Sequence, residues 1–576
     1  MSNKPTPDQG GDFGDFLFRV GIVGGAVLTG GNWLGGNLAA LVGRGRVLHA
    51  GLGQAFSALF RLPTHAHDPA KAWGPVLAGR LPGPVVYWIA NTIVVVVLLA
   101  GAMFVVARVD NRRHQPADKR RRLGVPTQAR LAGPRDLAPL RTRRPVPGRF
   151  VLARWKRGYL STEADQYRGR RGVKGAVAIF GPTQSGKTTG LVTGVAAWDG
   201  PAVVSSVKAD LLHQTIEARR ARGEVKVFDP LGVTGLPSAS WSPLRPARRL
   251  SGALAAAQML ARAGNDEGPN DRFWRGQAEQ LIAAMLWTAA NTEGQTMANV
   301  VRWVLELDRP APDKAGTLSP LVRLLADNTD SQVAMDARQV QGWLTGQWST
   351  DPRTTSSVYA TARNAVWPWA DPDVAAASES SEVDLDWLLR GNNTLYLCAP
   401  LGDETRIGVV FSVLLDDLIT QAFDRYNRTG QPLDPRVLVL LDEAANTFLP
   451  KLPQWSATVS GAGIQLVTVW QSKGQLDKTY QGQADNLLTN HRTKLLYPSG
   501  MSDLATIDYF AKLVGTEHVR ADMDDYRWSA TPPMPQQRTP ATSVSLLSPN
   551  VLRQLGVGDA VLLHGALAPI WIKKRH

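Results

Sequence analysis

Short apolar runs alternate with longer amphipathic stretches over much of the chain after residue 170, and this alternation predicts an α/β fold. Runs of four or five apolar residues separated by helical stretches are typical of parallel strands joined by crossover helices. We therefore expect a parallel sheet covered by helices. The predicted strands lie at 176–180, 202–206, 225–228, 394–398, 437–441, 466–470, 493–497 and 560–564.

A different pattern occupies the stretch 250–371. Apolar residues recur there at helical spacing, as between Trp274 and Met285, and no strand signal interrupts them. The sequence therefore predicts an all-α domain inserted into an α/β domain. The two parts of that α/β domain would be 149–249 and 372–576, the second including a C-terminal segment.

Two uncharged apolar stretches stand near the N-terminus, at 20–43 and 84–107. A helix needs about 20 such residues to cross the hydrocarbon core of a bilayer, so both are predicted as transmembrane helices. The first stretch is rich in glycine and could instead be re-entrant or interfacial. A cleavable signal peptide is not expected, because the first residues are acidic and no clear cleavage site follows.

The charges beside these stretches predict the topology. Between Arg108 and Arg157 there are 16 Lys or Arg residues and three acidic ones, and such basic flanks stay on the cytoplasmic side. Residues 1–19 and the basic juxtamembrane linker 108–148 would then be cytoplasmic, and 44–83 would form a short extracytoplasmic loop. This predicts a multi-pass protein of the inner (cytoplasmic) membrane. Topology and anionic lipid alone can explain the basic stretch, without DNA.

Composition narrows the range of partners and sites. The formal net charge of +15 favours polyanionic partners such as nucleic acid, anionic lipid or nucleotide. Cys398 is the only cysteine, which excludes an intrachain disulfide and a zinc cluster.

A phosphate-binding loop motif follows the first predicted strand, where the chain reads G-P-T-Q-S-G-K-T. Glycines let backbone N–H groups approach phosphates closely, and the N-terminus of the next helix favours anions. Lys187 would place its charge on the β- and γ-phosphates, and the Thr188 hydroxyl would bind Mg²⁺. We therefore predict a site for ATP and Mg²⁺. Its nucleotide-binding residues are Gly181, Pro182, Thr183, Gln184, Ser185, Gly186, Lys187, Thr188 and Thr189.

An acidic pair ends the apolar run 437–441. A hydrolytic site of this kind needs such a strand beside the strand that precedes the loop. Asp442 would hold Mg²⁺ through water, and Glu443 would orient and polarise the attacking water. Without the loop motif, the pair could equally be a solvated turn at a strand end. With it, we predict Asp442 as a metal residue and both Glu443 and Lys187 as catalytic residues.

Gln471 follows the next predicted strand, which ends at Trp470. A neutral amide at this place can contact the γ-phosphate and report hydrolysis to moving parts, so Gln471 is a third candidate catalytic residue. A glutamine that merely ends a strand is the alternative interpretation.

The order of these features resembles the type IV coupling proteins, the TraG/TraD-like conjugation ATPases related to FtsK/HerA motors. The resemblance covers roughly residues 149–574, and the VSSVKADL form looks most like actinobacterial members. Further motifs of the family recur at 204–211, 227–230, 241–244, 271–274, 367–374 and 470–476.

The resemblance implies a RecA-like P-loop NTPase domain with an inserted all-α domain, preceded by transmembrane helices. It implies a membrane-anchored ATPase that delivers DNA, with or without attached protein, to a type IV secretion or conjugation channel. The implied partners are single-stranded, relaxase-linked DNA, the channel, relaxosome or adaptor proteins, and the membrane. It also implies a homo-hexamer, because a neighbouring subunit would complete each nucleotide site.

One departure from the family concerns an arginine. Many members carry one just before the strand that ends in the sensor glutamine, but 459–463 reads V-S-G-A-G. Arg492 is our first candidate for the missing charge. Two alternatives stay open. One is an FtsK-like translocase of double-stranded DNA, which would be expected to carry a C-terminal winged-helix domain, for which the residues after Gln471 leave little room; the second is a nucleotide-binding membrane receptor for secreted proteins without turnover. The missing arginine favours the second of these, while Lys187 and the acidic pair argue against it.

Overall fold

The computed structural model describes residues 11–113, 121–123, 125–163, 166–167, 170–171, 174–206, 209–262, 271–310, 316–519 and 542–573. The chain divides into two compact units, residues 1–127 and 128–576. Each unit is described by itself.

Two long helices form the first unit, α1 (Gly11–Arg44) and α4 (Pro84–Arg113), with shorter elements between them. Glycines bring the long helices together: a Cβ atom on Gly35 would lie 2.3 Å from the Asn91 Oδ1 atom. Polar side chains bond across the contact, where the Tyr87 hydroxyl and the Asn91 amide donate to Asn32 Oδ1 at 2.8 and 3.1 Å. The shorter elements are α2 (Leu52–Arg61), η1 (Leu62–His65), η2 (Pro69–Trp73) and α3 (Pro75–Ala78).

The predicted membrane spans 20–43 and 84–107 fall within α1 and α4. Among the residues that the structure describes, no helix has the length and apolar character needed to cross a membrane. The described side chains do not include residues 20–27, 99 and 102–107. The described part of the chain therefore does not support the two predicted spans.

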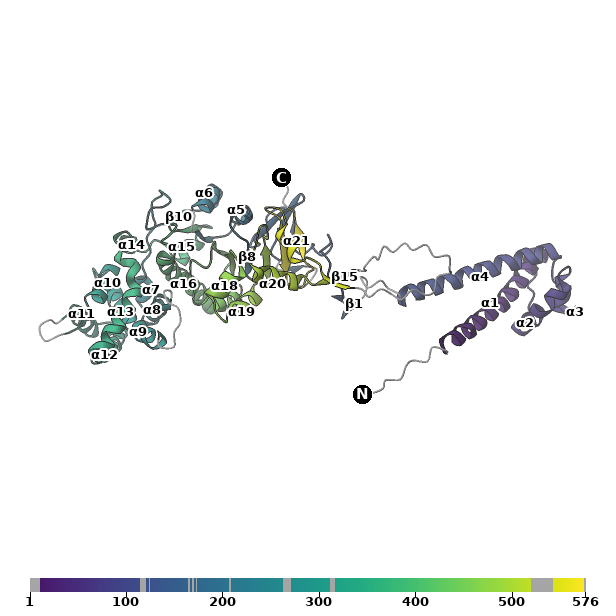
Figure 1. Ribbon diagram of the computed structural model, residues 1–576, viewed down its shortest axis with the longest axis horizontal. Helices are drawn as coiled ribbons and strands as arrows, with labels where there is room; N and C mark the ends of the chain where they lie inside the picture. The colour runs from purple at the N-terminus through teal and green to yellow at the C-terminus, as the bar shows by residue number, and fades with distance from the viewer. Residues whose placement is uncertain are drawn as a thin grey trace, which may run out of the picture. The chain divides into compact units, whose positions relative to one another are not determined.

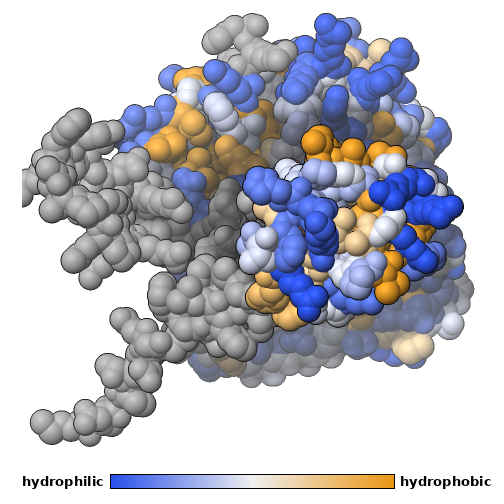
Figure 2. Space-filling model, turned by 90° about the vertical axis from the view of Figure 1, so that its right-hand side faces the viewer, coloured by the Kyte–Doolittle hydropathy of each residue, from blue (hydrophilic) through white to orange (hydrophobic). Residues whose placement is uncertain are grey.

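Several large apolar side chains of this unit are nevertheless exposed. On α2, Leu52, Phe56 and Phe60 are 61%, 51% and 69% exposed, and they recur every fourth residue along one side of the helix. On α4, Val85 and Ile89 are exposed as well. Figure 2 shows orange apolar side chains beside blue hydrophilic ones on one face.

A nine-stranded sheet forms the centre of the second unit, in the order β10-β11-β9-β12-β13-β8-β14-β17-β18. The first seven strands in this order run parallel, whereas β17 and β18 are antiparallel to their neighbours. The sheet is thus mixed, and the expectation of a wholly parallel sheet was wrong at this edge. The strands are β8 (Val177–Phe180), β9 (Ala202–Ser206), β10 (Val225–Phe228), β11 (Thr394–Cys398), β12 (Val437–Leu441), β13 (Ile464–Trp470), β14 (Thr493–Leu496), β17 (Ala560–His564) and β18 (Ile570–Ile572).

Helices cover both faces of this sheet, and successive strand residues point into two different cores. Leu438 and Leu440 belong to one core together with α5 and α6, while Val439 and Leu441 belong to the other together with α16. These flanking helices are α5 (Lys187–Ala197), α6 (Asp210–Arg220), α16 (Glu404–Thr429), α17 (Leu452–Thr458), α18 (Lys473–Thr479), α19 (Ala484–Asn490), α20 (Leu504–Val514) and α21 (Pro549–Arg553).

Short strands that the sequence did not predict lie outside the large sheet. The strands β3 (Arg141–Thr142), β5 (Gly158–Ser161) and β4 (Val151–Trp155) form a small antiparallel sheet, and Leu152 and Leu160 of it are buried in the core beside α5. The remaining short pairs are β1 (Arg121–Arg122) with β2 (Val125–Pro126), β6 (Gln166–Tyr167) with β7 (Arg170–Arg171), and β15 (Thr516–Val519) with β16 (Thr542–Ser545).

Helices occupy the described residues between β10 and β11, and Figure 1 shows α9 to α13, in teal, gathered at one end of the second unit. Their apolar side chains share one continuous core with a face of the sheet, because Trp287 and Trp303 belong to the same buried cluster as Phe228 and Leu395. The helices are α7 (Leu244–Ala247), α8 (Leu250–Arg262), α9 (Asp271–Asn291), α10 (Met297–Leu305), α11 (Leu318–Ala326), α12 (Ser331–Trp348), α13 (Pro352–Val366), η4 (Trp367–Ala370), α14 (Pro372–Ala376) and α15 (Leu385–Leu389).

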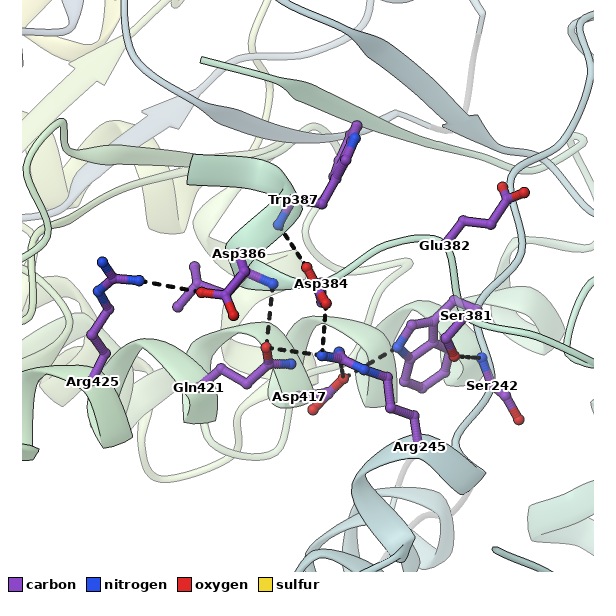
Figure 3. Close-up of polar contacts among 12 residues, drawn as sticks. Ser242, Arg245, Ser381, Glu382, Asp384, Asp386, Trp387, Asp417, Gln421 and Arg425 are labelled. Atoms are coloured by element: carbon purple, nitrogen blue, oxygen red, sulfur yellow. Dashed lines mark hydrogen bonds and ion pairs between the residues drawn. The ribbon is translucent and has the colours of Figure 1, made fainter. Parts of the chain in front are cut away.

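A charged junction fixes the beginning of this helical region to the α/β part (Figure 3). The Arg245 guanidinium on α7 lies 3.1 Å from Asp384 and 3.4 Å from Asp417 of α16, and the Trp241 indole N–H donates to the same Asp417 oxygen at 3.2 Å. Asp384 also caps α15 by accepting the Trp387 N–H at 2.6 Å. The family motif at 241–244 therefore has a structural role here.

Candidate functional site

The predicted phosphate-binding loop connects β8 to α5, whose first residue is Lys187. Gly186 ends the loop at a φ of +98°, a left-handed conformation that glycine adopts without strain. A Cβ atom on Gly181 would lie 2.7 Å from Ser185 Oγ, so the loop closes tightly only because this residue is glycine. Thr188 and Thr189 are exposed at the start of α5, where backbone N–H groups favour an anion.

Lys187 turns back over this loop. Its ammonium donates hydrogen bonds to the carbonyl oxygens of Gly181 and Pro182, the latter at 3.0 Å. Burial lowers the pKa of the Lys187 ammonium below its usual value, and the nearby carboxylates of Glu443 and Asp442 oppose this shift. The structure thus brings the predicted lysine and the predicted acidic pair into one electrostatic environment.

The loop, the acidic pair and Gln471 follow three adjacent strands. The order is β12, β13, β8, so β13 lies between the strand of the acidic pair and the strand of the loop. The expectation that the two strands would be direct neighbours was therefore wrong. All three are parallel and their carboxyl ends meet at one edge, with Leu441 level with Thr468 and Phe180 level with Trp470. Two strand spacings put the acidic pair about 10 Å from the loop, across the end of β13.

Neutral groups contact the acidic pair. Asp442 accepts a hydrogen bond from the Ser206 hydroxyl at 3.2 Å, and Glu443 accepts one from the Gln475 side-chain amide at 2.8 Å. Glu443 has a φ of +65°, a left-handed conformation that costs a non-glycine residue about 1–2 kcal/mol. Strain of this kind gathers at functional sites, where the surrounding structure holds it in place.

Gln471 is exposed at the end of β13. Its backbone N–H donates to the side-chain oxygen of Gln475 at 2.9 Å. The amide that contacts Glu443 therefore belongs to Gln475, a residue to which sequence reasoning gave no role. Only its place in the motif 470–476 could have drawn attention to it.

The donor set of the loop fits a bound phosphate. Ser185 is 2% exposed, and within the described residues its hydroxyl has no hydrogen-bond partner. A buried hydroxyl beside a lysine ammonium and a helix N-terminus suits an anion. No group of three or more His, Cys, Asp or Glu side chains in the described ranges could hold a metal ion. Mg²⁺ typically uses one or two protein ligands together with substrate phosphates, and Thr188 and Asp442 are the residues that could hold it here, Asp442 through water.

Arg492 lies elsewhere. It directly precedes β14, which runs parallel to β8, so it is at the edge of the sheet opposite to the loop. Its guanidinium donates to Glu163 at 2.8 and 3.1 Å. Within its own chain, Arg492 does not join the other candidate residues.

Comparison with known proteins places these features in a family. The model of the family described as type IV secretory system conjugative DNA transfer matches residues 136–576. A probable conjugal transfer protein TraG of Sinorhizobium fredii is 22% identical over 403 residues, which cover 68% of this chain and 60% of that protein. A conjugal transfer protein TraG of Escherichia coli is 24% identical over 360 residues, covering 59% of this chain and 55% of that protein. The chain thus spans little more than half the length of these relatives.

Solved structures share the fold. The unbound monoclinic form of the bacterial conjugative coupling protein TrwBdeltaN70 has a TM-score of 0.56 at 15% identity, covering 78% of this chain and 92% of that one. The plasmid coupling protein TrwB in complex with ADP and Mg²⁺ has a TM-score of 0.52 at 15% identity, covering 70% of this chain and 85% of that one. At this identity the likeness concerns the fold alone.

Proposed function

Because the chain belongs to the family of type IV secretory system conjugative DNA transfer proteins, we propose that it is an ATP-hydrolysing coupling protein. It would deliver DNA, single-stranded and linked to a relaxase, to a type IV secretion channel. The observation that carries the proposal is the meeting of the phosphate-binding loop, the acidic pair and Gln471 at the carboxyl ends of three adjacent parallel strands.

The loop would bind the phosphates of ATP. The N–H groups at the start of α5 and the Ser185 hydroxyl would donate to phosphate oxygens. Lys187 would exchange the carbonyl oxygens of Gly181 and Pro182 for the β- and γ-phosphates, which are stronger acceptors for an ammonium. Thr188 and Asp442 would hold Mg²⁺, which when bound neutralises charge on the phosphates.

Glu443 would act on the water that attacks the γ-phosphate. It lies about two strand spacings from the loop, which leaves room for the terminal phosphate and a water between them. Its carboxylate would orient that water and accept its proton. Gln471 follows the strand that lies between them, and its exposed side chain would contact the γ-phosphate and sense its loss.

A steady-state ATPase assay on the full chain, purified in detergent, tests the proposal. We expect Mg²⁺-dependent hydrolysis that single-stranded DNA stimulates. Lys187→Ala should abolish hydrolysis, and Glu443→Gln should retain ATP binding while slowing turnover about 10²- to 10⁴-fold. Lys226→Ala and Glu217→Gln are matched controls, because they make the same charge changes on β10 and on the exposed face of α6.

The outcomes separate the three candidate functions. Equal hydrolysis by the wild-type chain and Lys187→Ala would reject the loop as the active site. Stimulation by double-stranded but not single-stranded DNA would favour the FtsK-like alternative. ATP binding without turnover, unchanged by DNA, would favour a receptor for secreted proteins.

Membrane association and a homo-hexamer complete the proposal. The exposed Leu52, Phe56 and Phe60 of α2 support contact of the first unit with lipid. Flotation of the full chain with liposomes tests this contact, and reporter fusions after Arg122 and near Pro63 test the topology. For the hexamer, light scattering with and without an ATP analogue should show assembly of six subunits, because a neighbouring subunit would complete each nucleotide site.

A further inference from the structure

Gln475 occupies the third position of α18, a helix that begins at Lys473, shortly after the end of β13. Its backbone N–H donates to the Ser472 hydroxyl at 3.1 Å, an ordinary N-cap contact. Its side chain bonds at both ends: the oxygen accepts the Gln471 N–H at 2.9 Å, and the nitrogen donates to Glu443 Oε1 at 2.8 Å. One amide thus bridges the sensor position and the candidate catalytic carboxylate.

The chemistry of the two partners fixes the orientation of this amide. A backbone N–H needs an acceptor and a carboxylate needs a donor, so rotating the amide by half a turn would oppose donor to donor and acceptor to acceptor. Among side chains of this length, glutamine alone supplies both groups. A glutamate could accept from Gln471 but, when ionised, could not donate to Glu443.

The backbone of Glu443 is attached to the same strand. Its left-handed conformation is followed by a hydrogen bond from the Ala444 N–H to the Val469 carbonyl of β13 at 2.9 Å. Through Gln475, the side chain of Glu443 is attached to the residue that follows β13. The position of the carboxylate therefore depends on the end of β13 in two independent ways.

We propose that Gln475 is a positioning residue that aims the Glu443 carboxylate at the attacking water and couples it to the end of β13. The proposal rests on the function proposed above. With Oε1 of Glu443 held by Gln475, the second carboxylate oxygen is left to receive the proton of the water. A shift of Gln471 on loss of the γ-phosphate would move the carboxylate through the same bridge.

A role confined to the start of α18 is the competing explanation, and Gln475→Glu separates the two. This variant keeps an acceptor for the Gln471 N–H but removes the donor and sets a second carboxylate against Glu443. If Gln475 positions Glu443, kcat of the full chain should fall at least about tenfold while KM for ATP changes less than about twofold. Gln475→Met, which loses both bonds, should show the same split.

Ser472→Ala is the matched control, because it removes the N-cap contact of α18 without touching Glu443. We expect its kcat to stay within about twofold of the wild-type value. A wild-type kcat in Gln475→Glu, or an equal loss of kcat in Ser472→Ala, would overturn the positioning role. The proposed function is tested separately, by comparing the wild-type chain with Lys187→Ala. If Lys187→Ala loses the hydrolysis that the wild-type chain shows, the proposed function stands even when the positioning role fails. If the two chains hydrolyse ATP equally, the proposed function itself is rejected.

Discussion

Two segments of the chain have nearly the same sequence and opposite surroundings. Residues 413–417 read V-L-L-D-D and residues 439–443 read V-L-L-D-E. The first lies in the middle of α16, and the second spans the end of β12. The same apolar run followed by two acids thus forms a helix in one place and a strand end in the other.

The acids of the helix are buried and paired with cations. The side chains of Asp416 and Asp417 are 5% and 7% exposed, and Lys451 and Arg245 lie 2.8 and 3.4 Å from them. Burial raises the pKa of both carboxyl groups, and these cations oppose the shift. The paired cations balance the charge of these carboxylates within the fold, so we interpret this acidic pair as structural.

The acids of the strand end contact neutral donors, Ser206 and Gln475, and lie near the lysine of the phosphate-binding loop. A hydroxyl or an amide orients a carboxylate without cancelling its charge, as the proposed roles of Asp442 and Glu443 require. The contacts described for the two pairs differ although their sequences are nearly the same, so the neighbours in space and not the sequence distinguish one pair from the other.

The largest expected effect is a difference in ATPase activity between a substitution in the strand-end pair and the same substitution in the helix pair. Asp442→Asn removes the carboxylate proposed to hold Mg²⁺, so Mg²⁺-dependent turnover should fall on the order of 100-fold. Binding of a fluorescent ATP analogue without Mg²⁺ should be retained. Asp416→Asn makes the same chemical change in the helix, and the turnover of its folded fraction should stay within about twofold. Comparable losses of kcat in Asp442→Asn and Asp416→Asn would contradict the distinction between a functional pair at the strand end and a structural pair in the helix.

A smaller effect should separate the pairs by stability. Lys451 donates to both oxygens of Asp416, at 2.8 and 3.0 Å. Lys451→Met leaves a buried carboxylate without its cation and should lower the free energy of unfolding by about 3 kcal/mol, measured by urea denaturation. The double variant Asp416→Leu with Lys451→Met should recover most of that loss, because it removes both charges. If the double variant has the same low free energy of unfolding as Lys451→Met, the loss of stability does not come from the unpaired charge of Asp416.

Much of the sheet could be predicted from the sequence. The runs 202–206, 225–228, 394–398, 437–441 and 560–564 coincide with strands, because a buried strand reads as a continuous apolar run between polar turns. The strand β18 was missed, since Ile570–Ile572 is short and pairs at an antiparallel edge. The sequence did not predict the order of the strands in the sheet either. For this reason the position of β13 between β8 and β12 corrected the expectation that β8 and β12 are neighbours.

The sequence could predict the part of the candidate site whose residues all belong to one local motif. The loop 181–189 is local, and its length and glycines specify its conformation. The bond between Gln475 and Glu443 joins residues 32 positions apart, and no spacing rule connects them. Strand direction likewise puts Arg492 at the edge of the sheet opposite to the loop of its own chain, and its role toward a neighbouring subunit stays a prediction. The proposed role of each of these residues depends on which residues lie close to it in the fold, and the sequence alone does not show that.

The smallest effect concerns pH. Because burial raises the pKa of Asp417 above its ordinary value of 3.8, its ionised form destabilises the folded chain relative to a neutral residue. This penalty is present above the raised pKa and fades as the pH falls toward 3.8, where the carboxyl is protonated. Melting temperatures of the wild-type chain relative to Asp417→Asn should therefore shift in favour of the wild type between pH 7 and pH 4.5. Asp386→Asn is the control, since that side chain is 79% exposed and should show no such trend. A difference that moves the other way would mean that Arg245 outweighs burial and holds Asp417 ionised, as a surface ion pair would.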